Sequence, residues 1–138
     1  MSQWPDSQRW HELCETNGVM WIAQFGSSAI GRETSSSDMD LSVWLRAITD
    51  HGAAQAIALT NALMPLLGRS DVDVVVANTA APLLQWSIAR TGCVLYEREA
   101  GAFRRFQLYA WKRHEEAQRV RAWDARFVHG CLEEWARG

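Results

Sequence analysis

The stretch that decides the fold is residues 19–45, which read VMWIAQFGSSAIGRETSSSDMDLSVWL. An apolar run at 19–25 leads into a loop of small and hydroxyl-bearing residues, and a second apolar run at 41–45 leaves that loop. Because both runs are short and bounded by turn residues, they predict two β-strands joined by a loop. The first run is apolar at almost every position, which is typical of a strand buried on both faces.

Two aspartates, Asp38 and Asp40, end the loop and open the second strand. Side chains two residues apart point to the same face of a strand, so these two carboxylates share one face. Carboxylates this close repel each other unless a cation lies between them. Mg²⁺ fits this role, because it binds proteins through one or two carboxylates together with substrate phosphates. The opposite face carries apolar side chains for the core: Met39, Leu41, Val43 and Leu45.

The loop begins with Gly26 and Ser27, which supply the second half of a nucleotide site. Gly26 lets the backbone turn and approach a ligand closely. The amides that follow it, with the Ser27 hydroxyl, are suited to form a nest for phosphate oxygens. Each half alone is common on protein surfaces, but a phosphate nest that leads into a pair of aspartates predicts nucleoside triphosphate chemistry.

Gly26-Ser27, followed after ten residues by Asp38-x-Asp40, resembles the signature of the DNA polymerase beta-like nucleotidyltransferases. The short chain is similar to the minimal (MNT) branch of this family, and within it to the antitoxins paired with HEPN-domain toxins. The likeness covers roughly residues 19–100 and extends to the valine run at 72–76, where Asp73 matches the third acidic residue of the family.

The loop departs from the family pattern at Ile30, where many relatives have an arginine. Either Arg32 replaces that arginine in a phosphate contact or this contact is missing, and Ser37 is a further candidate for binding the nucleotide.

The resemblance implies an α/β fold in which a small mixed β-sheet is flanked by helices, the nucleotidyltransferase fold. It implies that Asp38, Asp40 and Asp73 are the catalytic and metal-binding residues, with two Mg²⁺ ions and with ATP as the substrate. It also implies a protein adenylyltransferase that moves AMP from ATP to a tyrosine of a cognate HEPN ribonuclease toxin. Such an antitoxin silences the toxin and forms a hetero-oligomer with it.

Two other functions stay open at this point. The chain would also neutralise a toxin if it acted by binding alone, with an idle transferase site. Alternatively, it would modify a small molecule, as the related aminoglycoside nucleotidyltransferases do, although those usually carry a further domain or a dimer partner to form the acceptor pocket.

Composition narrows the class of protein. A length of 138 residues suits one domain over residues 1–138, and a net charge of −2 argues against direct binding of nucleic acid. No apolar run reaches membrane-spanning length, no signal peptide is visible, and three widely spaced cysteines fit reduced thiols in a cytoplasm. Some of the eight tryptophans are expected to mark a surface for a partner.

Helices and strands interleave along the rest of the chain, which predicts an α/β architecture. Trp44, on the face of the aspartates, is expected to pack in the core or to lie near the base of a nucleotide. The charges of the last helix are expected to face solvent, or in part an acidic partner. The further predicted elements are a helix at 6–17 capped by Asp6 or Ser7, a helix at 51–63 capped by Asp50 and ended by Pro65 and Gly68, a strand at 71–77 with Asp71 at its entry, a helix at 82–90, a strand at 94–97, and a long helix at about 103–128 ended by Gly130.

Overall fold

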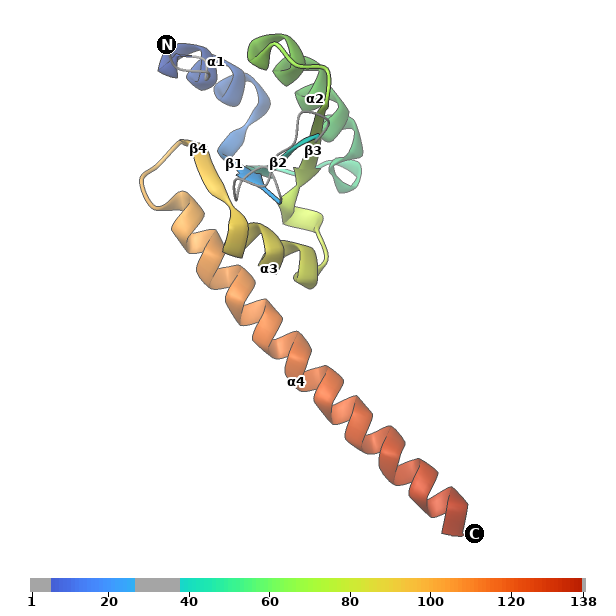
Figure 1. Ribbon diagram of the computed structural model, residues 1–138. Coiled ribbons are helices and arrows are strands. Elements are labelled where there is room, and N and C mark those ends of the chain that lie inside the picture. Colours follow the sequence, from blue (N-terminus) through green and yellow to red (C-terminus); the bar gives the residue numbers. More distant parts are fainter. Residues whose placement is uncertain (1–5, 27–37, 138) are drawn as a thin grey trace.

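A computed structural model describes residues 6–26 and 38–137 of the chain. Along the sequence the main elements follow the order α-β-β-α-β-α-β-α (Figure 1). Their bounds are α1 Ser7–Asn17, β1 Val19–Phe25, β2 Met39–Leu45, η1 Asp50–Gly52, α2 Ala53–Leu67, β3 Val72–Val76, η2 Ala77–Thr79, α3 Pro82–Thr91, β4 Cys93–Glu97 and α4 Ala102–Arg137.

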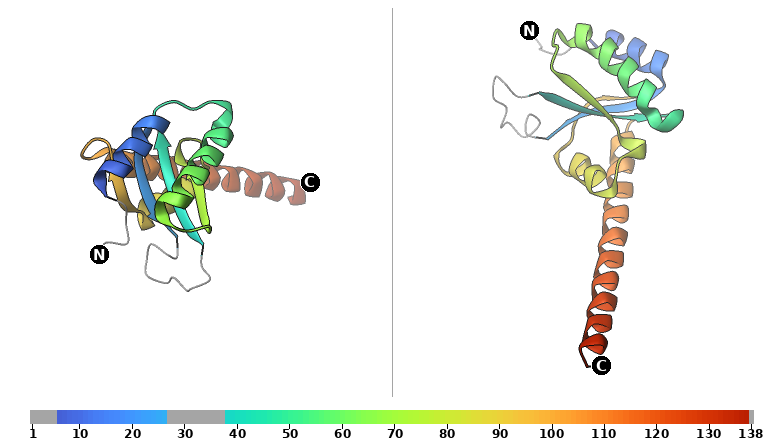
Figure 2. Two further views of the ribbon diagram at one scale, coloured as in Figure 1. Left: turned by 90° about the horizontal axis from the view of Figure 1, so that it is seen from above. Right: turned by 90° about the vertical axis from the view of Figure 1, so that its right-hand side faces the viewer.

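The four strands form one mixed sheet in the order β3-β2-β1-β4. Strand β1 is antiparallel to both of its neighbours, β2 and β4, while β2 and β3 run parallel. Helices α1 and α2 cover one face of the sheet, and α3 with the first turns of α4 covers the other (Figures 1 and 2). The prediction of a small mixed sheet flanked by helices is therefore confirmed.

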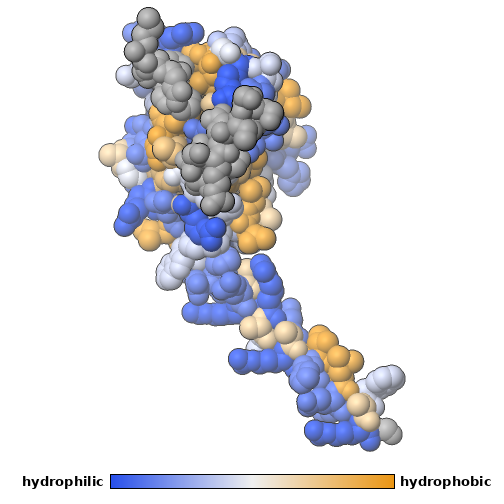
Figure 3. Space-filling model, viewed as in Figure 1, coloured by the Kyte–Doolittle hydropathy of each residue, from blue (hydrophilic) through white to orange (hydrophobic). Residues whose placement is uncertain are grey.

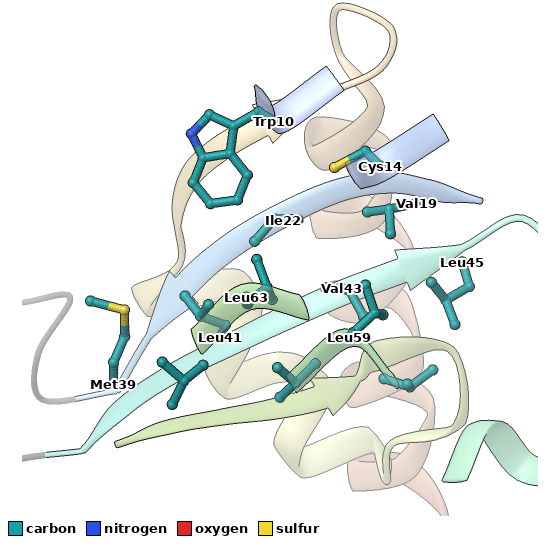
Figure 4. Close-up of a cluster of buried hydrophobic side chains, with 13 residues drawn as sticks. Trp10, Cys14, Val19, Ile22, Met39, Leu41, Val43, Leu45, Leu59 and Leu63 are labelled. Carbon is teal, nitrogen blue, oxygen red and sulfur yellow. The ribbon is translucent and has the colours of Figure 1, made fainter. Parts of the chain in front are cut away.

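The apolar face of β2 forms the centre of the larger core, as the alternation predicted. Met39, Leu41, Val43 and Leu45 are all buried beneath α1 and α2 (Figure 4). Burying a leucine side chain fully contributes about 1.5–3 kcal/mol, so this face is a main source of stability. The remaining buried members of the cluster are Trp10, Cys14, Val19, Ile22, Leu59, Leu63, Val72, Val74 and Val76.

A second core lies on the opposite face of the sheet, beneath α3 and α4. Trp21 is at its centre, and its ring centroid lies 4.8 Å from those of both Phe103 and Phe106. Ala23 and Phe25 of β1 are buried there as well, while Val19 and Ile22 face the first core. Strand β1 is thus buried on both faces, which confirms the reading of its apolar run.

Helix α1 agrees with its prediction in detail. The Asp6 side chain accepts a hydrogen bond from the Arg9 N–H at 2.9 Å, and Gly18 ends the helix with φ +66°. Cys14 on this helix is buried, and burial raises the pKa of its thiol to about 12. The three cysteines are all free, as their spacing predicted.

The start and end of α2 differ from the prediction. Asp50 is not its cap, because it lies in a short 3-10 turn with φ +49°, and Gly52 is the residue before the helix. Pro65 does not end the helix either, which continues to Leu67 before Gly68 caps it. Pro65 has no N–H to donate to the carbonyl of Asn61, which is an exposed residue.

The end of the long helix was also predicted wrongly. Helix α4 begins at Ala102 as expected, but it continues past residue 128 and through Gly130 to Arg137. Gly130 does not adopt the left-handed conformation that ends α1 and α2 at Gly18 and Gly68. A glycine in a helix interior costs only about 1 kcal/mol relative to alanine, so it need not stop a helix without that cap. Although α4 has 36 residues, no helix among the described residues is apolar enough to cross a membrane.

Candidate active site

Two of the predicted carboxylates lie side by side at one end of the sheet. Asp40 is the second residue of β2, and the parallel register places it directly opposite Asp73, the second residue of β3. Neighbouring strands are about 4.8 Å apart, so the two side chains leave the sheet on the same face as neighbours. Asp40 is half-buried and Asp73 is exposed. Asp38, also exposed, comes one residue before β2.

The charges of these aspartates act on one another. The pKa of Asp40 is raised, first because its carboxylate is partly buried and then because Asp73 and Asp38 place negative charge beside it. A cation near Asp40 would remove this repulsion. We refer to Asp38, Asp40 and Asp73 together as the acidic edge.

The donor atoms of the acidic edge are carboxylate oxygens, the ligands that hard divalent cations prefer. Within residues 6–26 and 38–137, no three histidine, cysteine, aspartate or glutamate side chains converge as a ready-made metal cage. The oxygens of the acidic edge nevertheless fit Mg²⁺, which usually takes one or two carboxylates and completes its octahedron with water and substrate phosphates. The arrangement therefore suits an ion that arrives with a phosphorylated substrate better than a permanently bound structural ion.

Gly26 lies directly beside the acidic edge, at the end of β1. Its φ is +79°, and a β-carbon built onto it would lie only 3.2 Å from Oδ2 of Asp40. A side chain at this position would therefore press on the carboxylate and would be strained in the backbone as well. The glycine lets the backbone at the end of β1 lie next to Asp40, and its predicted close approach to a ligand stays a prediction.

Thr91 also belongs to this neighbourhood, although no sequence pattern pointed to it. The Gly26 N–H donates a hydrogen bond to the Thr91 Oγ1 at 3.3 Å, and that hydroxyl donates to the Ser87 carbonyl at 2.8 Å. Thr91 is the last residue of α3, and 65 positions separate it from Gly26. This contact arises because α3 packs against β1, so no local sequence pattern could have predicted that Thr91 lies beside Gly26.

The other predicted nucleotide-binding residues lie outside the described part of the chain. Ser27, Arg32 and Ser37 all fall between residues 27 and 37. Of the predicted residues that are described, Gly26, Asp38, Asp40 and Asp73 come together at the same edge of the sheet.

Asp71 lies just before β3, at the strand's entry, as predicted. Arg69 donates to it twice, with 2.7 Å from Nε to Oδ1 and 2.5 Å from Nη2 to Oδ2. These hydrogen bonds lower the pKa of the Asp71 carboxyl. Asp71 is therefore paired with an arginine at the start of β3, whereas the acidic edge consists of carboxylates that repel.

Trp44 packs in the second core, which confirms the first of its two predicted roles. Its ring centroid lies 5.7 Å from that of Phe106 and 5.9 Å from that of Tyr109. It lines a hollow of about 420 Å³ over the far end of β2. Four residues of strand separate Trp44 from Asp40, roughly 13 Å, so this hollow is distinct from the acidic edge.

Comparison with known proteins identifies the class. The sequence model of the family "Polymerase beta, Nucleotidyltransferase" matches residues 8–100, which include the sheet and the acidic edge. The chain belongs to this family of nucleotidyltransferases. No curated protein matches its sequence.

Several solved structures share the fold. A chain in the crystal structure of a toxin–antitoxin with AMP-PNP has a TM-score of 0.65 and 22% identity, over 91% of this chain and 97% of that one. A chain in a structure of a tri-AMPylated Shewanella oneidensis HEPN toxin in complex with an MNT antitoxin has a TM-score of 0.58 and 21% identity, over 91% of this chain and 94% of that one. A protein described as a minimal nucleotidyltransferase is 31% identical, with a TM-score of 0.51, over 63% of this chain and 88% of that one.

Proposed function

We propose that this chain is an antitoxin that transfers AMP from ATP to a tyrosine hydroxyl of a HEPN-family ribonuclease toxin and so silences it. The observation that carries the proposal is the in-register pair of Asp40 and Asp73, with Asp38 and the start of the Gly26 loop beside it. Support for the partner comes from structural similarity to toxin–antitoxin complexes, one of which holds AMP-PNP and another an AMPylated toxin.

In this proposal the acidic edge binds ATP through two Mg²⁺ ions. Asp38 and Asp40 would hold the ion that contacts the triphosphate, and Asp40 with Asp73 would hold the ion next to the acceptor hydroxyl. Bound Mg²⁺ supplies positive charge to the attacking and leaving oxygens of an in-line displacement. The raised pKa of Asp40 is consistent with this role, because an ion beside it would restore the ionised carboxylate.

The transfer itself needs no nucleophile from this chain. The acceptor hydroxyl, placed beside Asp73, releases its proton to solvent water, and its oxygen forms a new bond to the α-phosphorus of ATP. The bond between the α-phosphorus and the oxygen of the β-phosphate breaks, and pyrophosphate leaves. Gly26 and the amides after it would bind phosphate oxygens, and Ser27, Arg32 and Ser37 are proposed as further contacts to the nucleotide.

Mass spectrometry of the partner tests this function. A HEPN-family protein, sought among the products of neighbouring genes, is incubated with ATP, Mg²⁺ and a smaller molar amount of this chain. The partner should gain about 329 Da for each AMP, the mass that remains once pyrophosphate has left. Its ribonuclease activity should fall at the same rate.

Two variants separate transfer from binding. Asp38→Asn with Asp40→Asn removes two charges of the acidic edge without changing the core face of β2, so it should fold, bind the partner and fail to modify it. Asp71→Asn is the control, because it removes a nearby carboxylate that is paired with Arg69. A partner that is neutralised without gaining mass, and still neutralised by the double variant, would show sequestration instead. A small hydroxyl compound modified in place of the protein would show the third function.

A further inference from the structure

The hydroxyl of Thr91 lies where the pairing of β1 with β4 stops, next to the acidic edge. The two strands are antiparallel, and the last pair at this end is Gln24 with Cys93. Moving two residues further along both segments in the same register leads to Gly26 and Thr91. At that point β4 has not yet begun, because Thr91 is the last residue of helix α3.

The side chain of Thr91 takes the place of the missing strand at this position. In an antiparallel ladder, a strand residue opposite Gly26 would accept the Gly26 N–H with its backbone carbonyl. Here the N–H donates to the Thr91 Oγ1 at 3.3 Å instead. The Thr91 hydroxyl gives its single hydrogen to the Ser87 carbonyl at 2.8 Å, so its oxygen is left as an acceptor for Gly26.

Packing anchors Thr91 through the residues around it. Two positions before it, the Ala89 carbonyl accepts a hydrogen bond from the Gln107 side chain of α4 at 3.0 Å. Directly after it, a β-carbon built onto Gly92 would lie only 2.6 Å from the Phe103 ring of the same helix. The chain around Thr91 is therefore packed closely against α4.

These contacts come from the first turns of α4, and the outer part of the helix takes no part in them. Phe103, Phe106 and Ala110 are buried in the second core. By contrast, every residue at 118–137 is exposed, the apolar side chains included (Figure 3). Thr91 is thus fixed by the second core, which lies beneath α3 and the start of α4.

Gly26 links this anchor to the acidic edge. Its neighbour in β1, Phe25, is paired with Asp40 of β2, and a β-carbon on Gly26 would lie 3.2 Å from the Asp40 Oδ2. Gly26 therefore has the Asp40 carboxylate as one neighbour and the Thr91 hydroxyl as another. The segment that the sequence predicts to bind phosphate starts directly after Gly26.

We propose that Thr91 is a positioning residue of the active site. Its hydroxyl holds the peptide between Phe25 and Gly26 beside Asp40 in the orientation that binding of ATP with Mg²⁺ needs. Thr91 acts through Gly26 and takes no part in the transfer of AMP itself. This inference rests on the proposed function, and it adds to the acidic edge a residue from α3.

Three variants isolate the hydroxyl. Thr91→Val replaces it with a methyl group of almost the same size, so no cavity forms. Thr91→Ser keeps the hydroxyl and removes only the methyl group. Thr60→Val is the matched control, because the Thr60 hydroxyl makes the same kind of bond within α2, to the Ala56 carbonyl at 2.8 Å, on the opposite face of the sheet.

Hydrogen exchange of the Gly26 amide, followed by NMR, tests the contact without any nucleotide. In Thr91→Val the amide has lost its acceptor and should exchange roughly tenfold faster than in the wild type, because no local bond has to open first. Thr91→Ser and Thr60→Val should leave its exchange rate unchanged. Equal exchange in Thr91→Val and the wild type overturns the proposal, because the hydroxyl then does not hold Gly26.

Transfer kinetics test the effect on the site. Thr91→Val should raise the KM for ATP and the dissociation constant of ATP with Mg²⁺ roughly threefold to tenfold, the range that one neutral hydrogen bond gives. Thr91→Ser and Thr60→Val should keep the wild-type values. A purely structural role would lower the amount of active protein, and so the apparent kcat, at unchanged KM. An unchanged KM in Thr91→Val therefore overturns the proposal even if the exchange rate of Gly26 changes.

The wild-type chain separates a failure of this inference from a failure of the proposed function. If the wild type binds ATP with Mg²⁺ and transfers AMP, and Thr91→Val does both equally well, only the role of Thr91 is wrong. If the wild type neither binds ATP with Mg²⁺ nor modifies a HEPN-family protein, the proposed function is wrong, and the role of Thr91 is wrong with it.

Discussion

The two faces of β2 differ in what they contribute. On one face Met39, Leu41 and Val43 are almost completely buried, and each adds to the stability of the fold. On the other face Asp40 is held beside Asp73 and Asp38, where repulsion and partial burial raise its pKa and weaken the fold. At the start of β2, one face thus packs in the core and the other carries the proposed site, whereas further along Ser42 and Trp44 of the Asp40 face are also packed. Substitution of a core residue at the start of β2 should mainly lower stability, and substitution of an acidic-edge residue should mainly lower the proposed activity.

The sharpest test of this separation is Asp73→Asn. If the proposed transfer is correct, the rate should fall on the order of 10²–10³-fold or more, because a charge at the reacting centre is lost at nearly constant volume. Thermal unfolding followed by circular dichroism should change little, since Asp73 is exposed.

The matched change, Asp71→Asn, should leave the rate within a few-fold of wild type. Asp71 is paired with Arg69 and does not contribute to the raised pKa of Asp40. An inactive Asp71→Asn beside an active Asp73→Asn would show that Asp71, and not Asp73, belongs to the active site.

Leu41→Ala, on the core face of β2, should lower stability and leave the transfer rate almost unchanged. Leu41 has no exposed surface, so truncation should lower the free energy of unfolding by about 2–5 kcal/mol. The transfer rate per folded molecule should stay close to wild type at low temperature. Denaturant unfolding measures the loss of stability, and the transfer rate is measured below the melting transition. A transfer rate that falls far more than the fraction of folded protein would show that Leu41 also affects the proposed site.

Gly26→Val should affect both properties, because Gly26 lies where the loop meets the acidic edge. Its positive φ would strain the valine backbone by about 1–3 kcal/mol, and the new β-carbon would press on Asp40. ATP binding measured by calorimetry should weaken as well. Gly101→Val, with φ +87° but far from the acidic edge, serves as the control for backbone strain alone. Equal ATP affinity in the Gly26 variant and wild type would remove Gly26 from the site.

The smallest expected effect is a gain in stability from Asp40→Asn. Because the folded-state pKa of Asp40 is raised, its ionised form weakens the fold. This penalty is absent below the unfolded-state pKa and fully present above the folded-state pKa. The variant should therefore melt slightly higher than wild type at neutral pH without metal, and the difference should vanish in acid. Mg²⁺ with ATP should raise the melting temperature of the wild type but not that of the variant. A variant less stable at neutral pH would show that Asp40 is favourably paired.

The local sequence pattern predicted strands β1 and β2, the apolar face of β2 and the pair of aspartates at the start of β2. Each of these follows from the two-residue period of a strand or from the conformational freedom of glycine, and both act over a few residues. The cap of α1 at Asp6 and its stop at Gly18 were predictable for the same reason.

Contacts between distant segments depended on packing instead. The strand register sets Asp73, and not Asp71, opposite Asp40, and the docking of α3 brings the Thr91 hydroxyl to Gly26. The extension of α4 beyond Gly130 was missed because a glycine stops a helix only when it adopts the left-handed conformation, which the residue type permits but does not require. Residue identity limits which conformations and contacts are possible, and packing of the whole chain selects among them.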